Sequence, residues 1–371
     1  MGPVSGAALR VGLLGAGMIS TVDYGYLPGL ARISDRVEVV AIASRTQERA
    51  RSIAHDHGIP AVYRSLEEML EADLDAVVNL TPIPVHFRTS RAILESGRHL
   101  VTEKPIASTV DEADTLIQLA EERDLLIVAA PADMITDEWV TARRLVNDNA
   151  IGKVAFARVQ SSHAGPAGMG WPVDPTWFYQ EGSGPLLDMA VYGLHQVTGI
   201  LGPAKRVMAM SGITAPVRRA RGGPFDGLEI PVSEPDNNLV MLDLGEATFA
   251  VVDGTFNVVG SKSPLMEVYG LEGTLLVNRR DDEVPPLELY RLGTEPGESG
   301  WTTPGDFSFA GGSDRFGELQ RGVLVEHLAD CLRDGTQPVL SGQHARHVLE
   351  IMMAAQKSAC EGVAVDLETT F

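Results

Sequence analysis

The fold is decided near the start of the chain by the stretch VGLLGAGMIS (residues 11–20). This stretch leaves an apolar run of strand type and enters a helical pattern. Gly15 permits the tight turn between them, Gly17 lets the backbone approach a pyrophosphate, and Ser20 is small enough for close helix–strand packing. The pyrophosphate would lie on the free amides at the start of the helix. The cofactor-binding residues expected here are Gly15, Gly17, Met18 and Ile19.

Short apolar runs alternate with helical patterns around this turn, over the first third of the chain. One capping box pairs Ser65 with Glu68 at a helix start, and a second pairs Thr109 with Glu112. Gly97 is expected to end a helix in the left-handed conformation. This alternation is typical of a parallel α/β sheet. The expected strands are residues 10–14, 37–43, 76–80, 99–102 and 125–129.

The pattern changes near residue 130, after which hairpin-like pairs of strands dominate and residues 281–306 are polar and poorly patterned. We therefore expect a dinucleotide-binding α/β domain over residues 1–130 and an α+β domain with a mixed or antiparallel sheet over residues 131–371. The expected strands are 153–161, 238–244, 248–252, 265–270 and 274–277. The expected helices are 137–147, 185–201 and 345–361, the last of which could pack back toward the first domain.

The composition argues against several classes of protein. The 371 residues are 44% hydrophobic, which is enough for two packed cores, and no apolar run approaches the ~20 residues of a membrane helix. The formal net charge of −20 repels nucleic acid and anionic lipid, so neither is an expected partner. The first ten residues do not have the pattern of a secretory signal. Cys331 and Cys360 suggest neither a disulfide framework nor a metal site, which indicates a reducing, cytoplasmic location.

The second expected strand ends in Ser44-Arg45, where an NAD site usually places a carboxylate for the ribose 2′-hydroxyl. Ser44 could bond a 2′-phosphate instead, and Arg45 could pair with that phosphate while stacking on the adenine. The alternative is that Arg45 is an ordinary surface residue. We expect NADP to be preferred, with NAD possible.

Polar motifs come after the next two strands, Thr81-Pro82 after one and Glu103-Lys104-Pro105 after the other. Because the carboxyl ends of parallel strands open on one crevice, these residues should converge on the cofactor. Lys104 could exchange a proton with a carbinol there, or it could be a surface lysine at a strand end. His86 lies nearby in the chain and could sit beside the cofactor. The expected cofactor contacts from these motifs are Thr81, Pro82, His86, Glu103 and Lys104.

A later apolar helix begins GPLLDMAVYGLH (residues 184–195) and carries Asp188, Tyr192 and His195 at i, i+4 and i+7. Three polar side chains on one stripe of so apolar a helix need partners, which a polyol could supply. The alternatives are an internal hydrogen-bond network or a solvated face, and a structural role for His195 is as well supported as a functional one.

The preceding loop, residues 162–184, is a candidate pocket wall because aromatic faces pack on sugar CH surfaces. The expected substrate-binding residues are His163, Trp171, Trp177 and His195. The run Trp177-Phe178-Tyr179 fits a domain core better than a pocket.

These motifs together resemble those of the glucose–fructose oxidoreductase / inositol dehydrogenase / MocA (Gfo/Idh/MocA) family. The resemblance covers nearly the whole chain and includes the stretch EVYGLEGTL (residues 267–275). It implies a Rossmann domain followed by a domain with a large open-faced mixed sheet. Such a sheet often mediates oligomerisation in this family, so we expect a homodimer or homotetramer.

The same resemblance implies that Lys104 is the catalytic lysine, that Asp188 is its partner or a substrate ligand, and that Tyr192 gives or takes a proton. Many members carry His in place of Tyr192, and the Tyr form is similar to members that use NADP. We therefore expect an oxidoreductase that acts on a secondary alcohol or ketone of a sugar, polyol or sugar derivative.

Two alternatives arise within the same family. One is a redox-neutral, glycosidase-type enzyme that retains its NAD. The other is a non-enzymatic sensor that binds NADP, which the joint presence of Lys104, Asp188 and Tyr192 makes less favourable.

Overall fold

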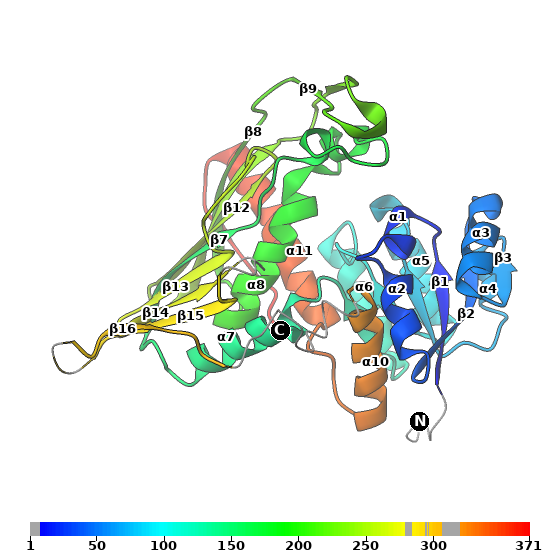
Figure 1. Ribbon diagram of the computed structural model, residues 1–371, viewed down its shortest axis with the longest axis horizontal. Helices are drawn as coiled ribbons and strands as arrows, with labels where there is room; N and C mark the ends of the chain where they lie inside the picture. The colour runs from blue at the N-terminus through cyan, green and yellow to red at the C-terminus, as the bar shows by residue number, and fades with distance from the viewer. Residues whose placement is uncertain (1–7, 279–283, 294, 296, 306–319) are drawn as a thin grey trace. The chain divides into compact units, whose positions relative to one another are not determined.

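The computed structural model describes residues 8–278, 284–293, 295, 297–305 and 320–371 (Figure 1). The chain forms two compact units. The first unit contains residues 1–136 and 313–349, and the second contains residues 137–312 and 350–371. Among the described residues, no helix combines the length and the apolarity that a bilayer crossing requires.

A six-stranded parallel sheet forms the centre of the first unit (Figure 1). Its strand order is β3-β2-β1-β4-β5-β6, so the order reverses between β1 and β4, the place where dinucleotides bind in such sheets. The strands are β1 (Leu9–Leu14), β2 (Val37–Ala43), β3 (Ala61–Tyr63), β4 (Ala76–Asn79), β5 (His99–Thr102) and β6 (Ile127–Ala129). The five expected strands are confirmed to within two residues, whereas the short β3 was not expected.

The helices around this sheet begin and end where the sequence provides caps. The Ser65 hydroxyl accepts a hydrogen bond from the Glu68 amide, and the Thr109 hydroxyl accepts one from the Glu112 amide, both at 3.2 Å. Gly97 has φ +80°, as its expected role at a helix end requires. The helices are α1 (Met18–Thr21), α2 (Tyr26–Leu30), η1 (Ala31–Ile33), α3 (Gln47–His57), α4 (Leu66–Met69), α5 (Ile83–Glu95), α6 (Val110–Glu122) and η2 (Asp133–Ile135).

The first unit also includes α10 (Gly322–Asp334). The expected domain boundary at residue 130 assigns this helix to the second domain, so that expectation is wrong for α10. Leu324, Val325 and Leu328 on this helix are 0% exposed, and the helix packs on α2 and β6. The next helix, α11 (Gly342–Glu361), begins in the first unit and ends in the second. Packing of the apolar face of α10 therefore returns a late segment of the chain to the first sheet.

A nine-stranded mixed sheet forms the second unit, in the order β16-β15-β14-β13-β7-β12-β11-β8-β17. Only β7 and β12 pair in parallel among the described neighbours. The strands are β7 (Val154–Gln160), β8 (Arg206–Gly212), β11 (Asn237–Gly245), β12 (Thr248–Thr255), β13 (Met266–Gly270), β14 (Gly273–Val277), β15 (Leu287–Arg291), β16 (Gly300–Thr302) and β17 (Val365–Asp366). The segment 281–306 thus holds β15 and β16, although its residues 281–283, 294, 296 and 306 lie outside the described part.

Helices cover one face of this sheet. The expected helix at 137–147 is α7 (Asp137–Asn147), and the expected helix at 185–201 is a π-helical turn, η5 (Leu186–Ala190), followed by α8 (Val191–Leu201). α8 packs on β7 and β12. The smaller elements are β9 (Val217–Arg219), paired with β10 (Glu229–Pro231), and the short helices η3 (Pro166–Gly168), η4 (Thr176–Tyr179) and η6 (Gly223–Phe225).

Candidate active site

The glycine turn of the first unit has the geometry that a dinucleotide requires. Gly15 has φ +118°, and a Cβ there would lie 2.9 Å from the Leu80 carbonyl oxygen, so the turn excludes larger residues. A Cβ at Gly17 would meet no atom within 4 Å, so the backbone there is open to a ligand. The Gly15 amide donates to the Ala43 carbonyl oxygen at 2.8 Å. The turn therefore joins the carboxyl ends of β1, β2 and β4.

Two arginines lie at the neighbouring ends of β2 and β3. The Gln47 side chain donates to the carbonyl oxygens of Ser44 (2.6 Å) and Tyr63 (3.0 Å) and so holds the two strand ends together. Arg45 and Arg64 come directly after these ends, and both are exposed without an ion pair to any described residue. Arg64 was not among the expected site residues because β3, which positions it, was not expected. Unpaired cations in so acidic a chain favour a phosphate ligand.

The Thr81-Pro82 loop is shaped by a buried asparagine that no motif in the sequence indicates. Asn79 is 0% exposed, and its Oδ1 accepts hydrogen bonds from the amide (3.2 Å) and hydroxyl (2.7 Å) of Thr81. Its Nδ2 donates to the hydroxyls of Thr89 (2.8 Å) and Ser90 (2.9 Å) on α5. The amide of Glu103 donates to the Asn79 carbonyl oxygen at 3.3 Å, which connects this loop to the end of β5.

His86 is 1% exposed and lies within this connection. Its Nδ1 is 2.9 Å from the carbonyl oxygen of Pro105, and its Nε2 contacts the carbonyl oxygen of Thr81. Burial lowers the pKa of the imidazole, although both carbonyls oppose this shift. The imidazole ring of His86 therefore connects the backbones of the two loops that we expect to contact the cofactor.

Glu103, the residue before Lys104, is held from two distant parts of the chain. Its carboxylate accepts a hydrogen bond from the Tyr26 hydroxyl (3.1 Å) and lies 3.5 Å from the Arg321 guanidinium at the start of α10. Burial would raise the pKa of this carboxyl, but Arg321, Lys104 and Tyr26 together lower it below its usual value. The peptide bond from Lys104 to Pro105 is cis. The contacts of the Glu103 carboxylate with Tyr26 and Arg321 thus anchor the backbone immediately before Lys104.

The polar helix of the second unit is not the regular α-helix that was expected. Asp188 lies in the π-helical turn η5, whereas Tyr192 and His195 lie in α8. Residues at i, i+4 and i+7 share one stripe of a helix that has 3.6 residues per turn. A π-helical turn is wound differently, so Asp188 is not on the stripe that this spacing predicts. Asp188 and Tyr192 are half-buried, whereas His195 is 5% exposed and its Nδ1 lies 2.8 Å from the Val191 carbonyl oxygen. His195 is therefore bonded to its own helix.

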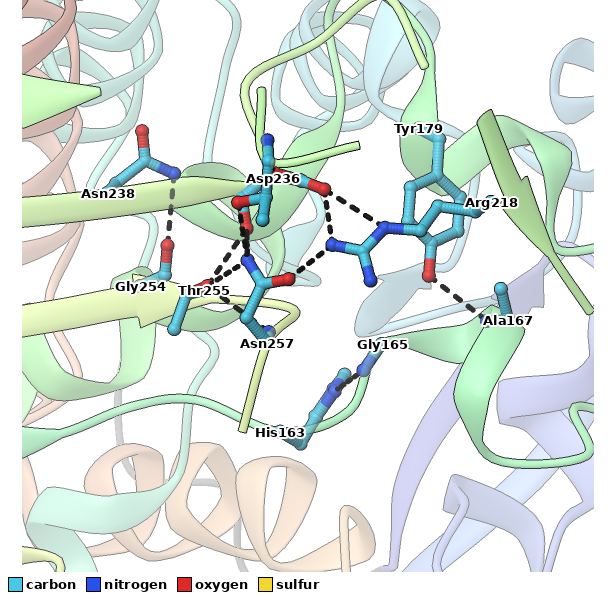
Figure 2. Close-up of polar contacts among 11 residues, drawn as sticks. His163, Gly165, Ala167, Tyr179, Arg218, Asp236, Asn238, Gly254, Thr255 and Asn257 are labelled. Atoms are coloured by element: carbon cyan, nitrogen blue, oxygen red, sulfur yellow. Dashed lines mark hydrogen bonds and ion pairs between the residues drawn. The ribbon is translucent and has the colours of Figure 1, made fainter. Parts of the chain in front are cut away.

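His163 lies after the end of β7 and is held by its neighbours (Figure 2). Its Nδ1 accepts a hydrogen bond from the Gly165 amide at 2.8 Å, and its ring stacks on Phe256 with centroids 5.4 Å apart. The Phe256 amide donates to the carbonyl oxygen of Asp236, whose carboxylate pairs with Arg218. Asp236 is 0% exposed, so this ion pair fixes the backbone behind the His163 ring.

The three neighbouring aromatic residues 177–179 divide between core and surface. Tyr179 is 1% exposed, and its hydroxyl accepts a hydrogen bond from the Ala167 amide (Figure 2). Burial raises the pKa of this phenol. Trp177, in contrast, is 42% exposed and does not belong to the core. The expectation of a core role is confirmed for Tyr179 and wrong for Trp177, because η4 turns the two side chains in different directions.

Trp171 carries a donor whose partner is missing among the described residues. Its indole Nε1 is shielded from solvent and has no hydrogen-bond partner there, while its ring packs edge-on against Phe178 at 5.9 Å. A shielded, unbonded N–H destabilises a protein by about 1–3 kcal/mol unless a ligand accepts from it. This donor agrees with the expected role of Trp171 in substrate binding.

We expect replacement of Trp171 by Phe to raise the KM for the substrate about fivefold or more without lowering Tm, because a hydrogen bond of ~1 kcal/mol is lost only from the complex. Steady-state kinetics and thermal unfolding measure the two effects. The control is Trp301→Phe on β16, where the tryptophan is 51% exposed, and it should change neither quantity. An unchanged KM for the Trp171 variant would contradict the role.

The comparisons with known proteins agree over most of the chain. The family described as "Oxidoreductase family, NAD-binding Rossmann fold" matches residues 9–130, and the GFO/IDH/MocA C-terminal domain matches residues 139–276. The scyllo-inositol 2-dehydrogenase (NADP(+)) IolW of Bacillus subtilis is 23% identical, with 97% of this chain and 96% of that protein covered. A trans-1,2-dihydrobenzene-1,2-diol dehydrogenase of Danio rerio is 31% identical, with 50% of this chain and 54% of that protein covered.

A solved structure supports the same fold. Levoglucosan dehydrogenase in complex with NADH and levoglucosan matches with a TM-score of 0.82 and 21% identity, covering 98% of this chain and all of that one. Because the match covers nearly the whole chain, it includes both the Rossmann-type sheet and the large mixed sheet.

Proposed function

Because the chain belongs to the Gfo/Idh/MocA family of oxidoreductases, we propose that this enzyme transfers a hydride between NADP and a secondary alcohol or ketone of a sugar or polyol. The observation that carries the proposal is the assembly at one edge of the first sheet. There the open glycine turn, the Asn79–Thr81 loop and the segment of Lys104 meet at the ends of β1, β4 and β5. The relatives named as inositol and levoglucosan dehydrogenases support a sugar-like substrate.

The proposed site residues have different roles in the reaction. The bound dinucleotide would accept or supply the hydride at its nicotinamide ring. Lys104 and Tyr192 would hold and move the proton of the reacting hydroxyl, and Asp188 would orient them or bind an adjacent hydroxyl. His163 and Trp171 would bind further hydroxyls. Glu103, held by Arg321, would keep the backbone of Lys104 in place.

The preference for NADP is supported by the residues at the ends of β2 and β3. Ser44-Arg45 stands where a carboxylate would hold the ribose of NAD, and Arg64 adds a second cation at the end of β3. The relatives include an enzyme named for NADP(+) and a structure with NADH, so the preference rests on these residues of the chain itself.

The proposed function is tested by a panel of inositols, levoglucosan, aldoses, ketoses, dihydrodiols and simple glycosides, each with NADP(H) and with NAD(H). We expect a change in nicotinamide absorbance with at least one polyol or sugar, and faster turnover with NADP(H). Conversion of a glycoside without any net absorbance change would instead identify a redox-neutral enzyme. Cofactor binding without turnover of any member would favour a sensor.

We infer that copies of the chain associate through the open face of the nine-stranded sheet. Met208 and Met210 on β8 stand directly opposite Met241 and Leu239 on β11, so the four side chains share one face. Their exposed fractions are between 42% and 73%, and Phe249 on β12 extends the same apolar area at 49%. An exposed apolar patch of this kind is typical of a protein–protein interface.

We expect the double variant Met210→Glu, Met241→Glu to reduce the molar mass in solution to that of a monomer. Each copy would bring two carboxylates to the interface, and the repulsion among the four would prevent two copies from associating. Light scattering after size exclusion measures the mass. The control is Val140→Glu on α7, an equally exposed apolar residue on a helix, which should leave the mass unchanged. If the double variant keeps the mass of the wild type, another surface joins the copies.

A further inference from the structure

Ser161 lies at the junction between the π-helical turn η5 and α8. Its hydroxyl oxygen accepts a hydrogen bond from the amide of Gly193 at 3.1 Å, and the same hydroxyl donates to the carbonyl oxygen of Met189. In an unbroken α-helix these two backbone groups would bond each other, because the N–H of residue i pairs with the carbonyl of residue i−4. The serine hydroxyl therefore lies between the Gly193 N–H and the Met189 carbonyl and replaces the hydrogen bond that they would form in a regular α-helix.

The position of this hydroxyl is set by the sheet. Ser161 comes directly after β7 and is 5% exposed, and its amide donates to the carboxylate of Asp253 on β12 at 3.0 Å. A Cβ at Gly193 would lie 2.9 Å from the Ser161 Cβ, so only glycine lets the helix approach so closely. A Cβ at Gly254 would lie 2.6 Å from that of Ala190, which shows the same close packing at the end of η5.

The junction lies between the two proposed catalytic residues of this helix. Asp188 precedes Met189, and Tyr192 precedes Gly193, so any change in helical winding at this point rotates one side chain relative to the other. One residue corresponds to about 100° of rotation and 1.5 Å of rise in an α-helix. π-helical turns of this type occur frequently at functional sites.

We propose that Ser161 is a positioning residue for the reaction: its hydroxyl, inserted between Met189 and Gly193, holds the π-helical turn that sets the orientation of Asp188 relative to Tyr192. The inference rests on the proposed function, because it assigns a consequence to the placement of those two side chains. In this role Ser161 acts through the helix, by its bonds to Met189 and Gly193. Without the hydroxyl, the Gly193 amide and the Met189 carbonyl can bond directly, and the helix can rewind by one residue.

The test compares Ser161→Ala and Ser161→Cys with Ser162→Ala. A thiol is larger than the hydroxyl but is a weak donor and acceptor, so the cysteine variant should give an intermediate effect. Ser162 is a matched control, because it is also 5% exposed but its hydroxyl bonds Asp253 and the Thr255 amide instead of the helix. The readouts are a crystal structure, Tm, the dissociation constant for NADPH, and kcat and KM across pH with the best substrate of the panel.

We expect Ser161→Ala to show α-helical winding over residues 186–190 and a kcat lowered about 10- to 100-fold, as misplacement of a catalytic group by ~1 Å produces. The pH profile of kcat should shift, and the affinity for NADPH should not change. Ser162→Ala should keep the π-helical turn and the pH profile, whatever its Tm.

Two results would overturn the inference. One is a π-helical turn that persists in Ser161→Ala, and the other is an unchanged kcat and pH profile in a rewound helix. The proposed function fails separately, if the wild-type enzyme turns over no member of the substrate panel with either cofactor. The two failures are therefore distinguishable.

Discussion

Replacement of Lys104 by Met is expected to lower kcat by about 10²- to 10⁴-fold, the usual contribution of a positioned proton donor or acceptor. The methionine keeps the length and the apolar stem of the side chain but cannot carry a proton. Because Glu103 is anchored by Tyr26 and Arg321, the loop itself should remain in place. Steady-state kinetics give kcat, and titration of the intrinsic fluorescence gives the affinity for NADPH, which should change little.

Two further variants complete this prediction. Tyr192→Phe should lower kcat by a similar factor, because it removes only the phenolic hydroxyl group. Lys357→Met, at an exposed position of α11, is the control and should behave as the wild type. Near-normal turnover in both the Lys104 and the Tyr192 variants would show that the roles assigned to them are wrong.

The second large effect concerns the choice of cofactor. We expect Arg45→Ala to weaken NADPH binding about 10- to 100-fold, since a hydrogen bond to a charged group contributes about 1.5–3 kcal/mol. Binding of NADH should change little because it has no 2′-phosphate. Arg64→Ala should act in the same direction, as this arginine lies at the adjacent strand end. The two dissociation constants are measured by calorimetry with NADPH and with NADH.

The matched control is Arg51→Ala, which removes the same charge from an exposed position farther along α3. It should leave the ratio of the two dissociation constants unchanged. Equal weakening of NADPH and NADH by Arg45→Ala would remove the basis for an NADP preference.

Local signals allowed much of the first unit to be predicted from the sequence. The φ of +118° at Gly15 favours glycine, so the turn can be recognised from the glycine motif in the sequence. Ser65 and Thr109 cap α4 and α6 by hydrogen bonds to amides only three residues later, so both caps can be recognised in a short stretch of sequence. Strands β4, β5 and β6 are almost entirely buried and therefore appear as continuous apolar runs, whereas the half-buried β3 does not.

The features that were missed depend on residues far apart in the sequence. Arg321 reaches Glu103 from more than two hundred residues away, and α10 brings it there through packing that no local pattern reveals. The π-helical turn depends on a hydroxyl at the end of β7, so a count at 3.6 residues per turn misplaces Asp188. His86 remains a predicted cofactor contact, and the contacts of its two ring nitrogens with the carbonyls of Thr81 and Pro105 could not be read from the sequence pattern.

The most direct measurement is a crystal structure of the enzyme with NADP⁺ and the best polyol of the panel. We predict that the Lys104 Nζ and the Tyr192 Oη lie within about 3.2 Å of the same substrate oxygen, beside the nicotinamide ring. A complex in which either group lies away from that oxygen, with the dinucleotide on the glycine turn, would contradict the proposed chemistry.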